Sequence, residues 1–160
     1  MSNIRLYREY RMKAYLNMNH FIMIHGNPGQ IHPHTWEFTF VTIVSGDDFI
    51  QFNEIEKSIE GFLAQYQNKV LNEVPPFDVT NPTVENVTDY IADEIRGILR
   101  EIGCELVSVE GSETPTRTYI VNYRHEADFT RRLYDIKNDR ISSVKDKIVE
   151  HMVEDRAVNR

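Results

Sequence analysis

The sequence has little of what marks secreted, membrane-embedded or nucleic-acid-binding proteins. Its 160 residues include one cysteine, Cys104, so no disulfide can form within the chain, and a reducing cytoplasm is the expected location. No apolar run approaches the roughly 20 residues that span a bilayer, and the polar first ten residues do not resemble a signal peptide. Basic residues number 18 against 25 acidic ones, and the formal charge of −7 argues against general binding to nucleic acid.

The composition is that of a globular domain. Hydrophobic residues make up 41% of the chain, and 160 residues are enough to bury a sizeable core. From about Ala127 the sequence becomes charged and carries only a thin apolar line at helical spacing. We therefore expect one domain over residues 1–124, followed by a charged helical extension over residues 125–160.

Hydrophobic periodicity predicts the secondary structure. Alternating apolar residues indicate strands, and apolar residues three or four apart indicate helices. The expected strands cover 11–24, 35–44, 105–110 and 118–123, and the expected helices begin near 53, 83 and 127. The order β-β-α-α-β-β predicts an α+β protein, in which an antiparallel sheet carries two helices on one face and a C-terminal helix follows.

Local signals set the expected ends of these elements. Asn53, followed three residues later by Glu56, is expected to be the N-cap of the first helix. Thr83 is expected to cap the second helix, and Gly103 to end it as the C′ residue. The polar run from Gly111 to Thr116 is expected to be a loop.

Three histidines are notable because they lie on the apolar side of two neighbouring strands. His32 and His34 are two residues apart, so their side chains point to the same face of an extended strand. His20 has the parity of the apolar residues in the preceding strand. An unpartnered imidazole is costly on an apolar face, whereas three that converge make a zinc site with an open fourth position. For His32 and His34 alone, the alternative is a pair of surface histidines at the start of a strand.

Six separated motifs, in this order, resemble those of one enzyme family. They are residues 16–20 (LNMNH), 32–36 (HPHTW), 49–55 (FIQFNEI), 69–73 (KVLNE), 81–86 (NPTVEN) and 113–116 (ETPT). Together they resemble the 6-pyruvoyltetrahydropterin synthase and 6-carboxytetrahydropterin synthase family, whose members adopt the tunnelling fold. The resemblance covers about Arg11 to Tyr123.

This resemblance implies a set of roles. His20, His32 and His34 would hold zinc, and Glu113 would bind the pterin ring through paired hydrogen bonds. Thr83 would cap its helix and could also face the pterin of a neighbouring subunit. Family members assemble as rings, commonly hexamers, with active sites at subunit interfaces, so a homo-oligomer is expected.

The chain departs from the family at its acid–base residues. The place of the family's cysteine is taken by Pro28, and its Asp-His pair corresponds to Gln67 and Asn68. None of these side chains can move a proton near neutral pH. His25, in the loop before the zinc motif, is the nearest replacement base. Weaker candidates are Glu37, Asp47 and Asp48.

Three functions therefore remain open. The first is a zinc-dependent lyase that acts on a reduced pterin, such as 7,8-dihydroneopterin triphosphate, with altered or weak activity. The second is a non-catalytic pterin- or purine-binding protein. The third is a structural protein in which zinc only holds the hairpin together and the C-terminal helix makes the contacts. The open fourth position expected at the zinc argues against the third.

Overall fold

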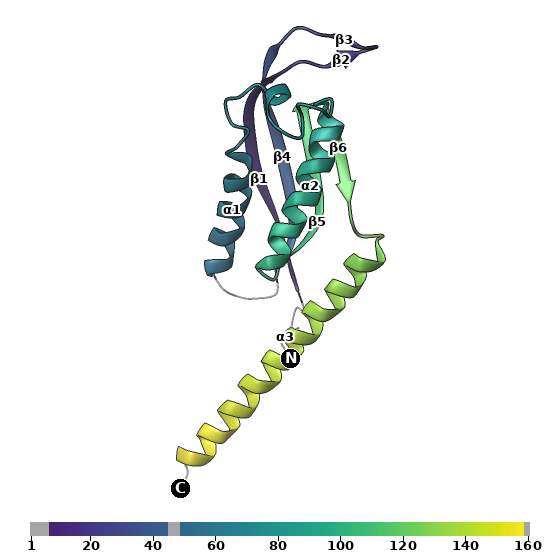
Figure 1. The fold of residues 1–160 in the computed structure, drawn as a ribbon. Coiled ribbons are helices and arrows are strands. Elements are labelled where there is room, and N and C mark those ends of the chain that lie inside the picture. Colours follow the sequence, from purple (N-terminus) through teal and green to yellow (C-terminus); the bar gives the residue numbers. More distant parts are fainter. Residues whose placement is uncertain (1–6, 45–48, 159–160) are drawn as a thin grey trace.

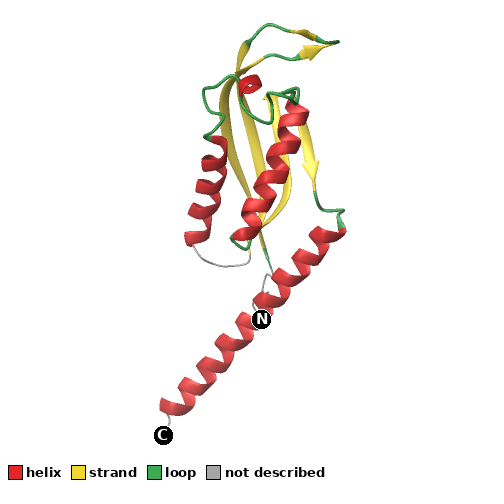
Figure 2. Cartoon of the chain, viewed as in Figure 1, coloured by secondary structure: helices red, strands yellow, loops and turns green. Residues whose placement is uncertain are grey.

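A four-stranded antiparallel sheet forms the centre of the molecule, and two helices cover one of its faces (Figures 1 and 2). The computed structural model describes residues 7–44 and 49–158. The sheet has the order β1 (Arg8–His20), β4 (His32–Val44), β5 (Glu105–Thr114) and β6 (Arg117–Asn122). The covering helices are α1 (Phe49–Leu63) and α2 (Val84–Glu101). The prediction of an α+β fold with both helices on one face is confirmed.

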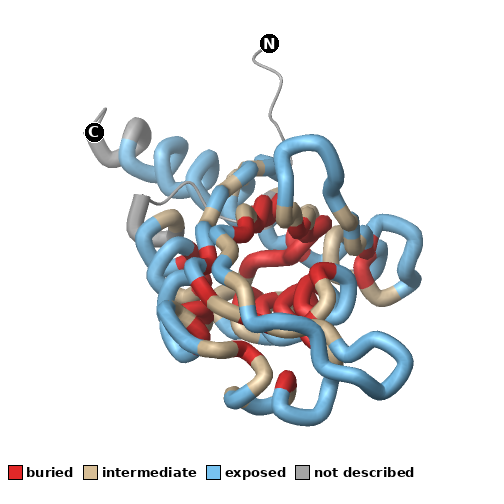
Figure 3. The backbone as a smooth tube through the Cα atoms, turned by 90° about the horizontal axis from the view of Figure 1, so that it is seen from above, coloured by how far each residue is buried: buried red, intermediate tan, exposed pale blue. Residues whose placement is uncertain are grey.

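The core lies between this sheet and its helices, as strand alternation requires. Trp36, Phe38 and Phe40 occupy alternate positions of β4, and all three are fully buried against the helices. Leu16 and Met18 supply the same face of β1. Figure 3 shows the buried stretches gathered in the middle of the molecule, with exposed stretches mostly around them.

The second covering helix begins and ends where its sequence predicts. The Thr83 side chain accepts a hydrogen bond of 3.2 Å from the backbone N–H of Asn86, so Thr83 is the N-cap of α2. Gly103 has φ of 77°, and Cys104 donates its N–H to the carbonyl of Leu99, which closes the helix at its C-terminus.

Several predicted boundaries are wrong. The first covering helix begins at Phe49, so Asn53 lies inside α1 and is not its N-cap. The strand expected to run on to Ile24 ends at His20, and β2 (Met23–Ile24) pairs separately with β3 (Asn27–Pro28). The run expected to be a loop from Gly111 onward instead continues β5 as far as Thr114.

Side-chain amides pair with the backbone along the outer edge of β1 and the segment after it. Each amide accepts from a backbone N–H and donates to a backbone carbonyl, as a neighbouring strand would. The pairs are Gln67 with Asn17 and Tyr15, Asn72 with Phe21, and Asn81 with Met23. The loop between the two covering helices is thereby fixed to the strand that carries His20. This loop includes the short helix η1 (Leu71–Glu73).

The C-terminal helix α3 (Ala127–Val158) packs against the domain near its start. Phe129 and Ile136 are buried in the core. The fully buried carboxylate of Glu105 accepts two hydrogen bonds from Arg100, of 2.9 and 2.7 Å, and Arg100 also pairs with Asp128 at 2.7 Å. The hydrogen bond to Glu105 raises the pKa of Arg100, and the bond from Arg100 lowers that of Asp128. This network joins β5, α2 and α3.

The C-terminal part of α3 extends away from the domain (Figure 1). Its outer part exposes four large apolar side chains: Ile148, Val149, Met152 and Val153. Within residues 7–44 and 49–158, no helix is both long enough and apolar enough to cross a membrane.

Candidate metal centre

The β1–β4 hairpin brings the three predicted histidines together. In its register His20 is opposite His32, and Met18 is opposite His34. All three histidines have the parity of the buried aromatic residues, so their rings point to the helix side of the sheet at its end. Their ring centroids lie 4.6 to 5.0 Å apart. The predicted convergence of the three rings is therefore present.

A carboxylate completes this cluster. Glu113, near the end of β5, places Oε1 2.7 Å from Nε2 of His34 and 3.9 Å from Nε2 of His20. One ligand atom from each of the four residues, His20, His32, His34 and Glu113, lies within 4.8 Å of every other. The extension of β5 to Thr114 makes this possible, because Glu113 has the same facing as the buried Gly111 two residues earlier.

Two backbone carbonyls fix the protonation of two of the rings. Nδ1 of His20 lies 2.8 Å from the carbonyl of Pro82, and Nδ1 of His32 lies 2.8 Å from the carbonyl of Gln30. A carbonyl oxygen can only accept, so each Nδ1 carries a proton, and in the neutral form of each ring Nε2 presents a bare lone pair. These two Nε2 atoms are 3.1 Å apart. Two facing lone pairs repel each other, and a cation bound to both nitrogens removes this repulsion.

The remaining histidine is also suited to bind a metal. Nε2 of His34 is buried and has no aligned hydrogen-bond partner among the described residues, although the Glu113 oxygen is close. Burial lowers the pKa of His20, which keeps that fully buried ring neutral, as a metal ligand must be. The donors are thus three imidazoles and one carboxylate, the set that zinc and similar divalent ions prefer.

The size of the cluster fits such an ion. Four ligands at 2.0–2.1 Å from a tetrahedral zinc lie about 3.3–3.4 Å from one another. The distances of 3.1 and 3.9 Å from His20 Nε2 lie on either side of this value, and the 2.7 Å contact is shorter by about 0.6 Å. Small side-chain movements are sufficient to admit the ion. The residues therefore fit a divalent metal.

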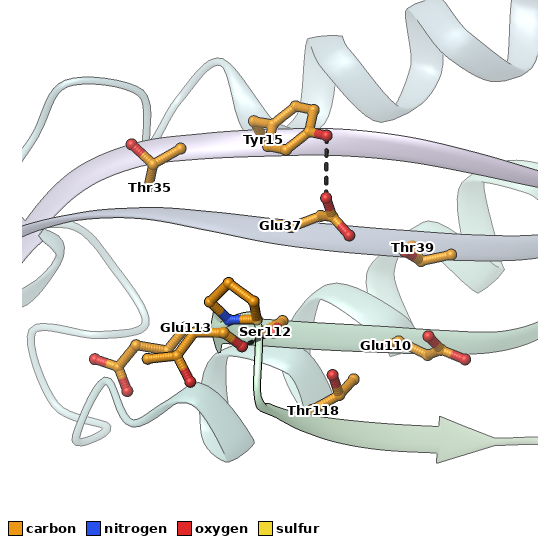
Figure 4. Close-up of a pocket in the computed structure, with 10 residues that line it drawn as sticks. Tyr15, Thr35, Glu37, Thr39, Glu110, Ser112, Glu113 and Thr118 are labelled. Carbon is orange, nitrogen blue, oxygen red and sulfur yellow. Dashed lines mark hydrogen bonds between the residues drawn. The ribbon is translucent and has the colours of Figure 1, made fainter.

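A polar groove of about 370 Å³ lies on the opposite face of the sheet, next to the cluster (Figure 4). Tyr15 and Glu37 border it, and the Tyr15 hydroxyl donates to Glu37 at 3.0 Å. Glu113 lies at one end of the groove. Figure 4 shows its carboxylate pointing away from Glu37 and Glu110. A second, more open cavity of about 500 Å³ borders His34 and Asn68.

The other candidate bases lie elsewhere or are engaged. His25 is exposed in the turn between β2 and β3, with φ of 50°, and is not part of the cluster. Glu37 accepts from Lys13 at 2.8 Å as well as from Tyr15, and these hydrogen bonds lower its pKa. Asp47 and Asp48 lie outside the described residues.

Pro28, Gln67 and Asn68, which the resemblance aligns with the family's acid–base residues, lie outside the cluster of three histidines and Glu113. Pro28 belongs to the short strand β3. Gln67 uses both ends of its amide on the backbone of β1, and Asn68 adopts the left-handed region, with φ of 59°. Gln67 therefore has a structural task that explains an amide at this position, because an ionised carboxylate could not donate to the carbonyl of Tyr15.

Sequence reasoning missed two features of the cluster. Glu113 was expected to bind a pterin, and the place of its carboxylate among the histidines was not foreseen. The carbonyls of Pro82 and Gln30 were not expected as partners of the rings. The Asn81-Pro82-Thr83 segment gave a usable signal, since a cap at Thr83 places the Pro82 carbonyl just outside the helix.

Comparison with known proteins gives one family. A family model described as 6-pyruvoyl tetrahydropterin synthase matches residues 9–125, which ends just before α3 begins at Ala127. No curated protein matches the chain.

Solved structures with this fold share little sequence with the chain. The 6-pyruvoyl tetrahydropterin synthase of Caenorhabditis elegans has a TM-score of 0.61 at 16% identity, over 72% of this chain and 95% of its own. The Plasmodium vivax enzyme has a TM-score of 0.52 at 14% identity, over 72% of this chain and 96% of its own. An uncharacterized protein from Wolinella succinogenes has a TM-score of 0.53 at 13% identity, over 74% of this chain and 99% of its own. These likenesses show the fold, and the family model covers most of the sequence. The chain belongs to the 6-pyruvoyl tetrahydropterin synthase family.

Proposed function

We propose that this protein binds a reduced pterin, such as 7,8-dihydroneopterin triphosphate, at a zinc centre held by His20, His32 and His34. The observation that carries the proposal is the convergence of these rings with Glu113 at the end of the sheet. Facing Nε2 lone pairs and a neutral, buried His20 favour a metal over a simple hydrogen-bonded cluster. Membership of the family supplies the ligand class.

The protein's own residues would divide the work of binding. The Pro82 and Gln30 carbonyls hold His20 and His32 in the form that binds metal. Glu113 would accept hydrogen bonds from the amino and ring N–H groups of the pterin. Thr83 caps α2, and a contact to the pterin of a neighbouring subunit is proposed for it as well. Bound zinc would polarise the hydroxyl groups of the pterin side chain as a Lewis acid.

We expect conversion of the pterin to be slow or absent. Acid–base groups typically contribute about 10²–10⁴ in rate, and Pro28, Gln67 and Asn68 cannot supply one. The engagement of Gln67 with the β1 backbone favours the second candidate function, a pterin- or purine-binding protein without turnover. His25 remains the proposed base if turnover occurs, and a His25→Ala variant tests it directly.

Assembly is part of the proposal. The strands β1 and β6 are the edges of the sheet, and Tyr15 and Ile120 expose apolar surface near those edges. We propose a ring-shaped homo-oligomer, most simply a hexamer, with pterin sites at subunit interfaces. Sedimentation at micromolar concentration measures this, and a monomer there would contradict it.

Zinc analysis and pterin binding test the proposal. Wild type is expected to hold one zinc ion per chain, and His34→Ala to lose most of it, because losing a ligand should exceed the roughly 10–100-fold cost of losing an outer partner. His125→Ala, at an exposed histidine, is the matched control and should keep its zinc. Full zinc occupancy in His34→Ala would contradict the assignment.

Pterin binding is the second arm of the test. Removing the Glu113 carboxylate deletes charge-assisted hydrogen bonds worth about 1.5–3 kcal/mol each, so Glu113→Ala should weaken pterin affinity at least tenfold. Unchanged affinity would show that the site is not a pterin site. Product analysis of wild type with 7,8-dihydroneopterin triphosphate measures turnover, and turnover at an ordinary enzymatic rate of about 1 per second or faster would refute the loss of the acid–base set.

A further inference from the structure

We infer that Glu113 is the fourth protein ligand of the metal when no pterin is bound, and that an arriving pterin must displace it. This inference rests on the proposed function only in its second half. Its first half concerns the protein and a metal ion alone. A centre with four protein ligands is closed, whereas one with three histidines has an open position, so the two arrangements differ in what a ligand must do to reach the ion.

The position of the carboxylate carries the first half. Glu113 Oε1 lies close to two histidine nitrogens at once, 2.7 Å from His34 Nε2 and 3.9 Å from His20 Nε2. It is close to His34 Nε2 without the alignment of a hydrogen bond, because that nitrogen has no partner by hydrogen-bond geometry among the described residues. The oxygen therefore lies within reach of an ion bound to these nitrogens.

The surroundings of Glu113 leave it available for this role. No lysine or arginine of the described residues forms an ion pair with it, since its ion-pair contacts are to His20 and His34. Its side chain is 21% exposed, so it is largely withdrawn from water at a site with no other partner for its charge. Three neutral imidazoles leave a divalent ion with its full charge, and a carboxylate ligand reduces that charge by one.

The fold holds Glu113 at this position from behind. Two residues earlier, Gly111 packs so closely against α2 that an added Cβ would lie 2.0 Å from Thr88 Oγ1. Ser112 donates its hydroxyl hydrogen toward the carbonyls of Thr114 and Arg117, at 2.5 and 3.0 Å, which tightens the β5–β6 turn. The end of β5 is therefore fixed on both sides of Glu113.

The displacement of Glu113 follows from the limited number of contacts that one carboxylate can make at once. A Glu113 that accepts paired hydrogen bonds from a pterin ring presents both oxygens to that ring. The same oxygens cannot then stay on the metal in the same geometry. Binding of the pterin would release the carboxylate and open a coordination position for the hydroxyl groups of the ligand. The metal centre would thus open only when a ligand with the correct ring is present.

Cobalt(II) replaces zinc in such sites, and its visible absorption reports ligand number and type. The experiment loads wild type, Glu113→Gln and Glu110→Gln with Co²⁺ and records spectra, and it measures Zn²⁺ affinity by competition with a chelator. Glu110 is the matched control, because it lies on the same strand but on the opposite face, in the groove. Circular dichroism establishes that each variant is folded, and Glu113→Asp, which keeps the charge but shortens the side chain, is the second variant.

The inference expects a changed Co²⁺ spectrum and at least a tenfold loss of Zn²⁺ affinity in Glu113→Gln, with Glu110→Gln unchanged, because even outer partners of metal ligands are worth about 10–100-fold. Glu113→Asp should also alter the spectrum. In wild type, saturating 7,8-dihydroneopterin should change the Co²⁺ spectrum.

Each failure has a separate meaning. A wild-type protein that binds neither ion would overturn the metal centre and this inference with it. Metal binding with the same spectrum and affinity in both Glu113 variants would overturn the inference alone. A pterin that binds without changing the wild-type spectrum would overturn the displacement.

Discussion

Replacing Gly111 by alanine should destabilise the protein through a single close contact. Gly111 lies in β5 where α2 crosses it, and a Cβ at this position would lie 2.0 Å from Oγ1 of Thr88 and 3.2 Å from Cε1 of Phe38. Thr88 is fully buried, and its hydroxyl is bonded to the carbonyl of Val84 at 2.6 Å, so it cannot simply turn away. Helix and strand must therefore separate slightly or Thr88 must change rotamer.

The size of the effect follows from known costs of overpacking. Extra atoms in a packed core typically cost about 1–3 kcal/mol, which corresponds to a fall in Tm of about 2–12 °C for a chain of this length. The Gly-to-Ala change by itself favours a strand by about 0.5–1 kcal/mol, and we expect the cost of the close contact to exceed this gain. Gly97 in α2 has nothing within 4 Å of its added Cβ, and there the same substitution should stabilise by about 0.5–1 kcal/mol.

Chemical denaturation measures the expected loss of stability in Gly111→Ala and the expected gain in Gly97→Ala. A third protein, Gly111→Ala with Thr88→Ala, removes the hydroxyl that the new methyl group meets. It should recover at least about 0.5 kcal/mol relative to the sum of the single changes, because residues in contact are coupled by that much or more. The recovery is partial, since Thr88 Cβ remains 3.1 Å from the new atom. Equal stability of Gly111→Ala and wild type, or strict additivity with Thr88→Ala, would refute the reasoning.

Two further predictions concern the helices. Thr83→Ala removes the N-cap of α2 and should cost about 1 kcal/mol in chemical denaturation, whereas Thr83→Asn should cost little because asparagine also caps; equal losses would argue against capping. Ile136→Ala should cost about 2–5 kcal/mol of stability, because Ile136 is 4% exposed. Ile148, in the outer part of α3, is 54% exposed, so Ile148→Ala should change the stability of the monomer by no more than about 0.5 kcal/mol. Similar losses in both variants would show that the outer part of α3 is packed as well.

The sequence was sufficient to predict the layers of the fold and the three histidines. Period-two alternation fixes which side chains share a face, so His20, His32 and His34 could be placed together before the register was known. The cap at Thr83 and the end at Gly103 were predictable because they depend on a few neighbouring residues.

Features that depend on distant partners could not be predicted in this way. Glu113 lies in a polar run that resembles a loop, and it stays in a strand because its neighbours pair: Ser112 with β4 and β6, and Thr114 with β6. Asn53 has a good capping pattern, but the helix begins one turn earlier, at Phe49. Local propensity is a weak guide where packing extends an element past its first plausible boundary.

The amides that line the outer edge of β1 restrict how sheets of two copies can join. Backbone groups that already have partners cannot accept another strand, so the stretch from Tyr15 to Met23 is closed to intermolecular strand addition. The earlier part of β1, from Arg8 to Ala14, and the outer edge of β6 are not closed by these amides. If β6 of one subunit paired with β1 of the next, the pairing could cover only the part of β1 that precedes the contact with Gln67. The register of such a pairing would therefore be restricted. Gln67 would then limit how far β6 of one subunit can overlap β1 of the next.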